Sequence, residues 1–196
     1  MVVYIQVTLL LFVKKDNMNI AIISSAHDTV PKSLIPKITA LIKSFKKIPD
    51  LKILTGGCSG ILGEIIKQAK CVNIQSKAYS PDKNRILHDK RLDNLASHHF
   101  SEIEYHEGFT SRSLSMIHNS DAILVINGRM GTLSEFSIAL EEGKKVGVLT
   151  DTGGIADHLE QITLWTNKKF SKQLLFSSDP KKIITWFIDN RKQFKS

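Results

Sequence analysis

The sequence predicts an α/β, Rossmann-like fold, with a parallel β-sheet and helices on both of its faces. Short apolar runs such as 20–23 lack polar alternation, which is typical of parallel strands covered on both sides. Segments with apolar residues at helical spacing, such as 34–45, alternate with these runs. Glycine-rich turns also stand at two strand-to-helix junctions. Regular alternation of this kind favours a single parallel sheet.

In the first half of the chain, apolar runs and helical spacing define five elements. We expect strands at 20–23, 51–54 and 72–76, and helices at 31–48 and 60–70. The segment 81–109 that follows is polar and irregular. We expect it to form an elaborated loop with room for one short strand.

The second half continues the alternation to the end of the chain. We expect strands at 122–126, 146–149 and 174–176, and helices at 110–119, 132–142 and 155–165. Asp179 followed by Pro180 predicts the start of a last helix, because aspartate caps helices and proline suits their first position.

The length of 196 residues suits one domain, which we place at 18–196. Residues 1–17 are interpreted as an extension. Its first thirteen residues are almost wholly apolar, too few for a membrane-spanning helix of about 20 residues, and no positive charge precedes them as in a secretory signal. The extension is either an extra strand or lies before a true start of translation at Met18.

The formal charge of +8 is concentrated near the C-terminus, where residues 167–196 hold eight Lys and Arg against two Asp. A solvated terminal helix accounts for this charge, so neither nucleic acid nor a membrane is an expected partner. Two cysteines make no disulfide framework, which predicts a reducing, cytoplasmic location. The histidines of 98–106 lack acidic or cysteine partners at ligand spacing, so we predict no metal, and we predict no cofactor.

Two glycine turns carry the functional signal. The first spans 56–63 and the second 127–132, and each joins a strand end to a helix start. Free backbone N–H groups and the helix dipole favour a phosphate there, while glycine lets the main chain approach it. The alternative is that the glycines only make tight turns. The predicted phosphate-binding residues are Gly56, Gly57, Gly60, Gly63, Gly128, Arg129, Gly131 and Thr132.

Arg112 and Met116, followed by Gly128, Gly131, Thr132 and Glu135, match a paired motif at ungapped spacing. Over 19–149 the chain resembles the Lonely Guy family of cytokinin-activating phosphoribohydrolases and the broader SLOG Rossmann superfamily. The resemblance implies hydrolysis of the N-glycosidic bond of a nucleoside 5′-monophosphate, giving free base and ribose 5-phosphate. It also implies a homodimer or higher homo-oligomer.

The resemblance implies roles for individual residues. Arg112 and Glu135 are the implied catalytic residues, and Met116 belongs to the implied nucleotide site. Three positions depart from the family pattern. Asn127 stands where the family has proline, Arg129 where it has glycine, and Ser113 where it has lysine.

Two other functions are open on the same fold. The first is a nucleotide-binding or sensor protein without catalysis, which the bulk and charge of Arg129 favour. The second is nucleic-acid binding, as in the related DNA-processing protein DprA. Cys58 is interpreted as a small turn residue, and the Asp-Thr-Gly sequence at 151–153 as a loop at the ligand edge of the sheet.

Overall fold

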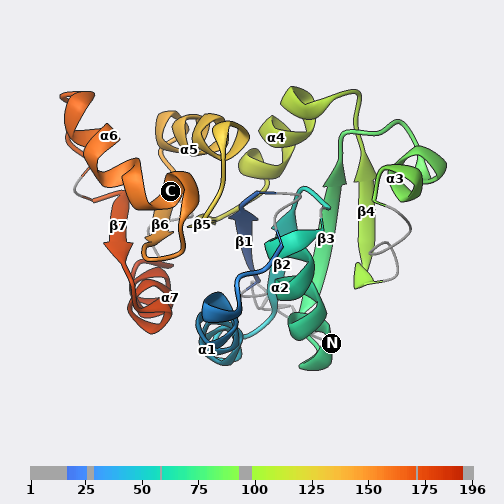
Figure 1. The fold of residues 1–196 in the computed structure, drawn as a ribbon, viewed down its shortest axis with the longest axis horizontal. Helices are drawn as coiled ribbons and strands as arrows, with labels where there is room; N and C mark the ends of the chain where they lie inside the picture. Colours follow the sequence, from blue (N-terminus) through green and yellow to red (C-terminus); the bar gives the residue numbers. More distant parts are fainter. Residues whose placement is uncertain (1–16, 26–28, 58, 93–98, 171, 192–196) are drawn as a thin grey trace, which may run out of the picture.

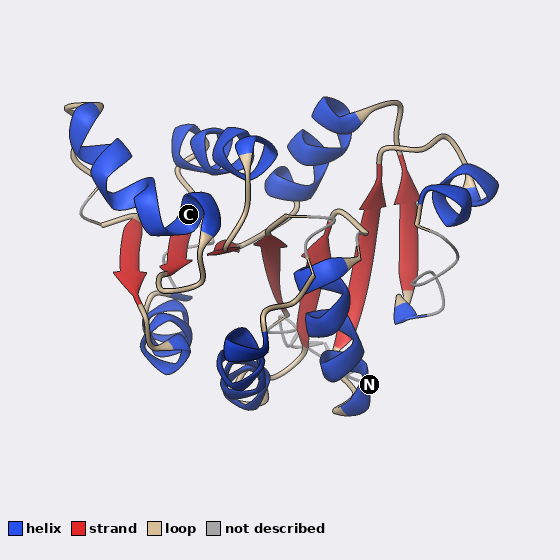
Figure 2. Cartoon of the chain, viewed as in Figure 1, coloured by secondary structure: helices blue, strands red, loops and turns tan. Residues whose placement is uncertain are grey.

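The computed structural model describes residues 17–25, 29–57, 59–92, 99–170 and 172–191 (Figure 1). Its seven-stranded sheet has the order β4-β3-β2-β1-β5-β6-β7, and all six strand pairs are parallel. Helices cover both faces (Figure 2). The predicted Rossmann-like α/β fold is confirmed. The interpretations of the N-terminal segment as an extension and of Cys58 as a turn residue stay predictions, because residues 1–16 and Cys58 lie outside the described residues.

The elements follow one another in nearly regular alternation. The first half contains β1 (Met18–Ile23), η1 (Lys32–Leu34), α1 (Ile35–Phe45), β2 (Leu51–Thr55), α2 (Gly60–Cys71), β3 (Gln75–Ser80), α3 (Arg85–Arg91) and β4 (Glu102–Tyr105). The second half contains α4 (Phe109–His118), β5 (Ala122–Ile126), α5 (Met130–Glu141), β6 (Lys145–Leu149), η3 (Gly154–His158), α6 (Leu159–Trp165), β7 (Leu174–Ser177) and α7 (Pro180–Asp189). Asp179 caps α7 by accepting a hydrogen bond from the Lys181 N–H at 2.8 Å.

The core has two layers, one on each face of the sheet. Buried side chains of α1, α2 and α7 pack on one face, and those of α4, α5 and α6 pack on the other (Figure 1). The central strand β1 contributes to both layers. Ile20 and Ile22 face the first layer, and Ala21 and Ile23 the second, as the twofold period of a strand requires.

The segment 81–109 differs from the predicted elaborated loop, because it contains the helix α3 as well as the strand β4. Asn84 caps α3 by accepting a hydrogen bond from the Leu87 N–H at 3.1 Å. In this helix His88 is buried while Ile86 is 79% exposed, so the buried positions are not the hydrophobic ones. Apolar periodicity therefore gave no helical signal there.

The third strand also lies later than predicted, at Gln75–Ser80 instead of 72–76. Helix α2 continues to Cys71, and a turn with Asn73 at a φ of 60° separates it from the strand. The apolar Val72 and Ile74 belong to this turn, where they pack on the core from outside the strand.

The sheet has a switch point at β1, which pairs with β2 on one side and β5 on the other. The chain leaves β1 toward β4 and then crosses to β5, so the loops at the carboxyl ends of β1 and β5 diverge. Such a switch point is the usual place of a ligand crevice in open α/β sheets.

Candidate ligand-binding site

Two adjoining cavities lie at the carboxyl edge of the sheet, by the switch point. The smaller cavity has a volume of about 110 Å³ and reaches Gly56, Leu62 and Arg91. The larger has a volume of about 230 Å³ and reaches Arg129, Gly131 and Thr132. Both are lined by Ser24, Phe109, Arg112 and Glu135. The two cavities therefore form one cleft.

Arg112 and Glu135 form an ion pair in this cleft. Arg112 Nη1 lies 2.8 Å from Glu135 Oε1, and the side chains are only 12% and 8% exposed. Ser113 Oγ donates a hydrogen bond to the same carboxylate oxygen at 2.7 Å. The helices α4 and α5, which flank β5, thus bring together side chains 23 positions apart. Burial of a charge is costly unless it is paired, and each member of this pair compensates the other.

The first glycine turn makes room for side chains from elsewhere in the chain. A Cβ on Gly56 would lie 2.6 Å from Arg112 Nη1, and one on Gly57 would lie 2.9 Å from His88 Cε1. Gly57 and Gly60 also have a φ of 66°, which favours glycine. Gly63 lies in the first turn of α2, and its N–H donates to the Ser59 carbonyl. Of the four glycines, Gly56 lines a cavity of the cleft.

The second turn is packed against itself. A Cβ on Gly128, whose φ is 98°, would lie 2.5 Å from Thr132 Oγ1. Gly131 is different, because a Cβ there would meet no atom within 4 Å, and this residue lines the larger cavity. Thr132 is 3% exposed and also lines that cavity. Gly131 and Thr132, in the first turn of α5, therefore face the cleft.

Arg129 stands directly before α5 and lines the larger cavity from an exposed position. Met116 of α4 is 0% exposed and lines the smaller one. Its thioether packs with the second core layer, so it forms part of the floor of the cleft.

The structure explains why Asn127 occupies the position of the family's proline. Its φ of 52° is inaccessible to proline, which requires a φ near −65°. Its N–H donates to Thr152 Oγ1 at 2.8 Å, its side-chain amide donates to the Thr152 carbonyl at 2.7 Å, and its Oδ1 accepts from the Gly128 N–H at 2.6 Å. Asn127 thus ties the second turn to the loop after β6. Thr152, the middle residue of the Asp-Thr-Gly sequence 151–153, accepts both of the hydrogen bonds that Asn127 donates.

Sequence reasoning did not find one group of side chains at the cleft, because it comes from the segment predicted to be a loop. Arg91, the last residue of α3, lines the smaller cavity. Its Nε donates to Asp82 Oδ2 at 2.8 Å, and Ser80 Oγ donates to the same oxygen at 3.0 Å. His88 Nδ1 lies 2.8 Å from Ser80 Oγ. Because the Ser80 hydrogen goes to Asp82, we assign the imidazole hydrogen to Nδ1.

His88 is fully buried, and burial lowers its pKa, with a further lowering by the nearby Arg91 cation. The imidazole is therefore neutral at pH 7. The positive charge on this side of the cleft comes from the guanidinium groups.

Three polar atoms of cavity-lining residues have no hydrogen-bond partner among the described residues. They are Ser24 Oγ, Arg91 Nη2 and Arg112 Nε, and all three are buried from solvent. Buried polar atoms normally have partners, so orphaned donors beside a cavity point to a ligand that accepts hydrogen bonds.

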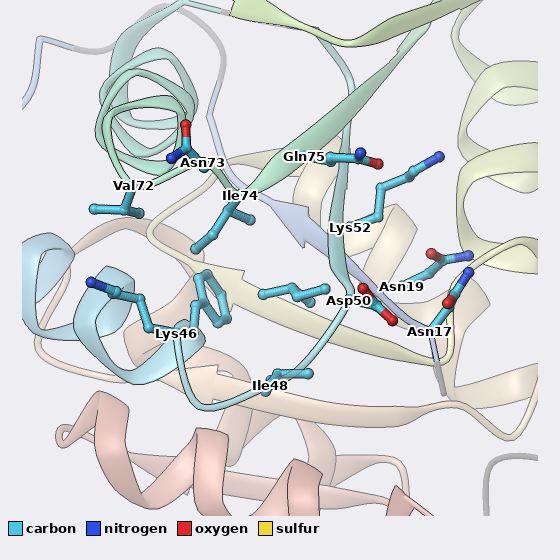
Figure 3. A pocket seen from close by; sticks show the side chains of 12 residues that line it. Asn17, Asn19, Lys46, Ile48, Asp50, Lys52, Val72, Asn73, Ile74 and Gln75 are labelled. Atoms are coloured by element: carbon cyan, nitrogen blue, oxygen red, sulfur yellow. The ribbon is translucent and has the colours of Figure 1, made fainter. Parts of the chain in front are cut away.

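A larger cavity of about 560 Å³ lies at the opposite, amino edge of the sheet (Figure 3). Its lining includes Asn17, Asn19, Lys52, Asn73 and Gln75, which precede or begin strands. Neither glycine turn contributes to it. The candidate site is the carboxyl-edge cleft, because only there do the predicted residues meet.

Among the described residues, no group of three His, Cys, Asp or Glu side chains is arranged to hold a metal ion. The described part of the chain also contains no helix long and apolar enough to cross a membrane.

Comparison with known proteins gives a family and a fold. The profile of the SLOG cluster4 family matches residues 17–184. An uncharacterized protein from Archaeoglobus fulgidus is 31% identical over 98 residues, which are 50% of this chain and 58% of that protein. The chain therefore matches less than two thirds of the length of this curated relative.

Solved structures share the fold at low sequence identity. A molybdenum cofactor binding protein from Rippkaea orientalis has a TM-score of 0.66 and 20% identity, covering 92% of this chain and 98% of that one. The molybdenum cofactor carrier protein of Chlamydomonas reinhardtii has a TM-score of 0.67 and 17% identity, covering 91% and 98%. DprA from Streptococcus pneumoniae has a TM-score of 0.63 and 16% identity, covering 86% and 61%. Likeness at these identities establishes the fold alone.

Proposed function

We propose that this chain, which belongs to the SLOG cluster4 family, binds a nucleoside 5′-monophosphate in the carboxyl-edge cleft and hydrolyses its N-glycosidic bond. The observation that carries this proposal is the Arg112–Glu135 ion pair, held 2.8 Å apart beside Gly131 and Thr132. A cation and a carboxylate stand there next to a helix start, which suits the binding of a phosphate and the stabilisation of positive charge on a ribose.

The phosphate is assigned to the start of α5. The N–H groups of the first helical turn have no partner within the helix, and the helix dipole favours an anion there. Gly131 leaves the backbone open to the larger cavity. Arg129, at the mouth of that cavity, supplies a cation where the family pattern has glycine. Arg112 lines the same cavity and reaches the phosphate from α4.

Glu135 is assigned to the reacting sugar. As the bond between C1′ and the base nitrogen breaks, its electron pair leaves with the base and positive charge develops on the ribose. A nearby carboxylate stabilises that charge. Water then adds its oxygen to C1′, and a proton from this water balances the charge on the departing base. In the described arrangement Arg112 neutralises Glu135. A phosphate that draws Arg112 toward itself would leave the carboxylate free to act.

A second function, nucleotide binding without turnover, is favoured by one observation. Glu135 Oε1 already accepts from Ser113 Oγ, which stands where the family has lysine. A carboxylate oxygen held by both Ser113 and Arg112 is weakly available to a developing cation. Two structurally similar proteins are described as binding or carrying a molybdenum cofactor, a function that needs no bond cleavage.

We also propose that the chain forms a homo-oligomer through the helices α4 and α5. Phe109, Leu114 and Met130 are 63%, 44% and 76% exposed, and they come from the helices α4 and α5 that carry the ion pair. An interface between copies of the chain would cover these large apolar side chains. Sedimentation measurements of mass would test the oligomer.

The function is tested by a screen of nucleoside 5′-monophosphates. We expect at least one of AMP, GMP, IMP, CMP and UMP to raise the melting temperature, and chromatography to detect the free base released from it. Stabilisation without base release would favour the binding protein over the hydrolase. Absence of any stabilisation by all five monophosphates would contradict both functions.

A further inference from the structure

The smaller cavity of the cleft contains a second cation that the proposed function does not use. Of its lining residues, Arg91, Arg112 and Glu135 carry charge, and the carboxylate of Asp82, which does not line the cavity, is paired with Arg91 at 2.8 Å. Arg112 is paired with Glu135 at 2.8 Å. Arg91 comes from α3, and in Figure 1 the helix α4 lies between α3 and α5.

Arg91 is oriented by groups behind it. Its Nε donates to Asp82 Oδ2, and Asp82 is held by Ser80 Oγ, which is held in turn by His88. These bonds occupy the Nε side of the guanidinium. Arg91 Nη2 has no hydrogen-bond partner within the described residues, although it is buried from solvent. A guanidinium fixed on one side and unsatisfied on the other is prepared for an anion.

Two more unsatisfied donors belong to residues that line the same cavity. Arg112 Nε and Ser24 Oγ are buried and also lack partners among the described residues. The cavity volume of about 110 Å³ exceeds the roughly 30 Å³ of one water, so there is room for a compact oxyanion.

We propose that Arg91 and Arg112 form a second anion subsite in the smaller cavity, which binds a second phosphoryl group on the nucleotide. The inference rests on the proposed function for the location of the first phosphate, at Gly131 and Thr132. Arg112 lines both cavities, so it stands between the two phosphoryl groups. The substrate class is therefore a nucleoside 5′-phosphate that carries a further phosphoryl group, on the 5′-phosphate or on the ribose.

The chain offers a matched control on the same helix. Arg85 and Arg91 both belong to α3, and each places its Nε against an aspartate, Asp89 and Asp82 respectively. Arg85 is 69% exposed and lines neither cavity of the cleft, whereas Arg91 is 21% exposed and lines the smaller one. Arg85→Gln removes the same charge without touching the proposed subsite.

The test compares AMP, ADP and adenosine 3′,5′-bisphosphate by calorimetric titration of the wild type, Arg91→Gln and Arg85→Gln. We expect ADP or the 3′,5′-bisphosphate to bind the wild type about tenfold more tightly than AMP, since one phosphoryl contact with a guanidinium is worth about that factor. Arg91→Gln should abolish this preference and leave AMP binding nearly unchanged. Arg85→Gln should keep the preference. Which probe binds more tightly identifies the position of the second phosphoryl group.

Wild-type protein with no preference over AMP would overturn the proposal, and so would a preference that survives Arg91→Gln. If Arg91→Gln lowers the melting temperature, the double variant Asp82→Asn, Arg91→Gln removes the stranded carboxylate and is titrated in its place. AMP binding and base release without any preference would reject the subsite alone. Preference without base release from any of the five monophosphates would support the subsite and reject monophosphate hydrolysis. Binding of none of the three probes, together with no stabilisation by any of the five monophosphates, would reject both.

Discussion

The two glycine turns stand at equivalent strand-to-helix junctions, but their glycines make room for different things. At the first turn, Gly56 and Gly57 accommodate Arg112 and His88, which come from α4 and α3. At the second turn, Gly128 accommodates Thr132 of the same turn, and Gly131 leaves open space. The first turn makes room for side chains from other helices, and the second leaves open space beside the larger cavity.

The difference teaches that a glycine motif alone does not locate a phosphate. Both turns have the residues expected of a phosphate-binding turn, but the atoms packed around their glycines differ. Arg112 connects the two, because it rests on Gly56 and pairs with Glu135 of α5. The predictions below test whether the roles of the turns differ as described, and whether Arg112 couples them.

The largest expected effect concerns the carboxylate beside the second turn. Glu135→Gln is nearly isosteric and should keep nucleotide affinity within a few-fold. We expect turnover to fall by about 10²–10³, which is typical of removing one well-placed electrostatic group. Arg112→Ala should reduce affinity and turnover together, because a phosphate contact stabilises bound substrate and transition state alike. Steady-state rates of base release and titrated affinities measure both. Equal turnover by wild type and Glu135→Gln would remove Glu135 from the mechanism.

A matched pair of alanine substitutions separates the two turns. Gly56→Ala places a Cβ against the Arg112 guanidinium, which is the movable end of a long side chain. The guanidinium should swing away and leave Glu135 without its cation, so we expect a loss of about 1–3 kcal/mol in the free energy of unfolding and about tenfold in nucleotide affinity.

Gly131→Ala should act in the opposite direction on stability. Its Cβ meets no protein atom, and α5 gains about 0.5–1 kcal/mol from replacing glycine in a helix. Affinity should nevertheless fall, because the methyl group stands where the ligand approaches the backbone. Chemical denaturation and titration of both variants measure the contrast. Unchanged affinity in Gly131→Ala would mean that the second turn, like the first, serves packing only.

A substitution of Arg129 tests whether the departure from the Lonely Guy pattern raises nucleotide affinity at the second turn. Arg129→Gly introduces the glycine of the Lonely Guy pattern and removes a cation from the lining of the larger cavity. We expect affinity for a nucleoside monophosphate to fall about three- to tenfold, as for one partly exposed charge contact with a phosphate. Titration at two salt concentrations should show a weaker salt dependence of affinity in Arg129→Gly than in the wild type. Tighter binding by Arg129→Gly would instead identify Arg129 as an obstruction.

Much of the fold was predictable because the central strands β1 and β5 contain continuous apolar runs. The strand predicted at 122–126 is observed at those residues as β5, and Asp179–Pro180 begins α7 as expected. The convergence of Arg112 and Glu135 at one edge of the sheet was also predictable, because their helices flank one strand. Their roles remain predictions.

The contribution of α3 was not predictable from pattern. The helix buries a histidine and exposes Ile86, so its hydrophobic periodicity contradicts its packing. The guanidinium of Arg91 is held at the cleft by Asp82, nine positions earlier in the chain. Nothing in local sequence fixes such a contact between a loop and the end of a helix. The contacts of Asn127 with Thr152 depend on its φ of 52°, and a backbone angle of this kind cannot be predicted from the residue type alone.

Acid should weaken the packing of the first turn through His88. The ring lies against Gly57, edge-on to Tyr105, with Asp82, Asp89, Arg85 and Arg91 as its charged neighbours. Burial, followed by the field of Arg91, lowers the pKa of His88 in the folded protein. In the unfolded chain the pKa of histidine is about 6.5. As the pH falls below about 6.5 the unfolded chain binds a proton that the folded protein excludes, so stability must fall.

We expect the free energy of unfolding to fall between pH 7.5 and pH 5.5. Below pH 6.5, His88 should contribute up to about 1.4 kcal/mol of this fall per pH unit. His88→Asn keeps a side-chain N–H near the position of Nδ1, where it can donate to Ser80. The variant should be less stable at pH 7.5 but should lose most of the pH dependence. His118→Gln, at an exposed histidine on α4, should keep the full dependence. Urea unfolding of the three proteins at both pH values measures the difference. If His88→Asn shows the same fall as the wild type, the acid sensitivity belongs to other groups, and the histidine behind the first turn has only a packing role.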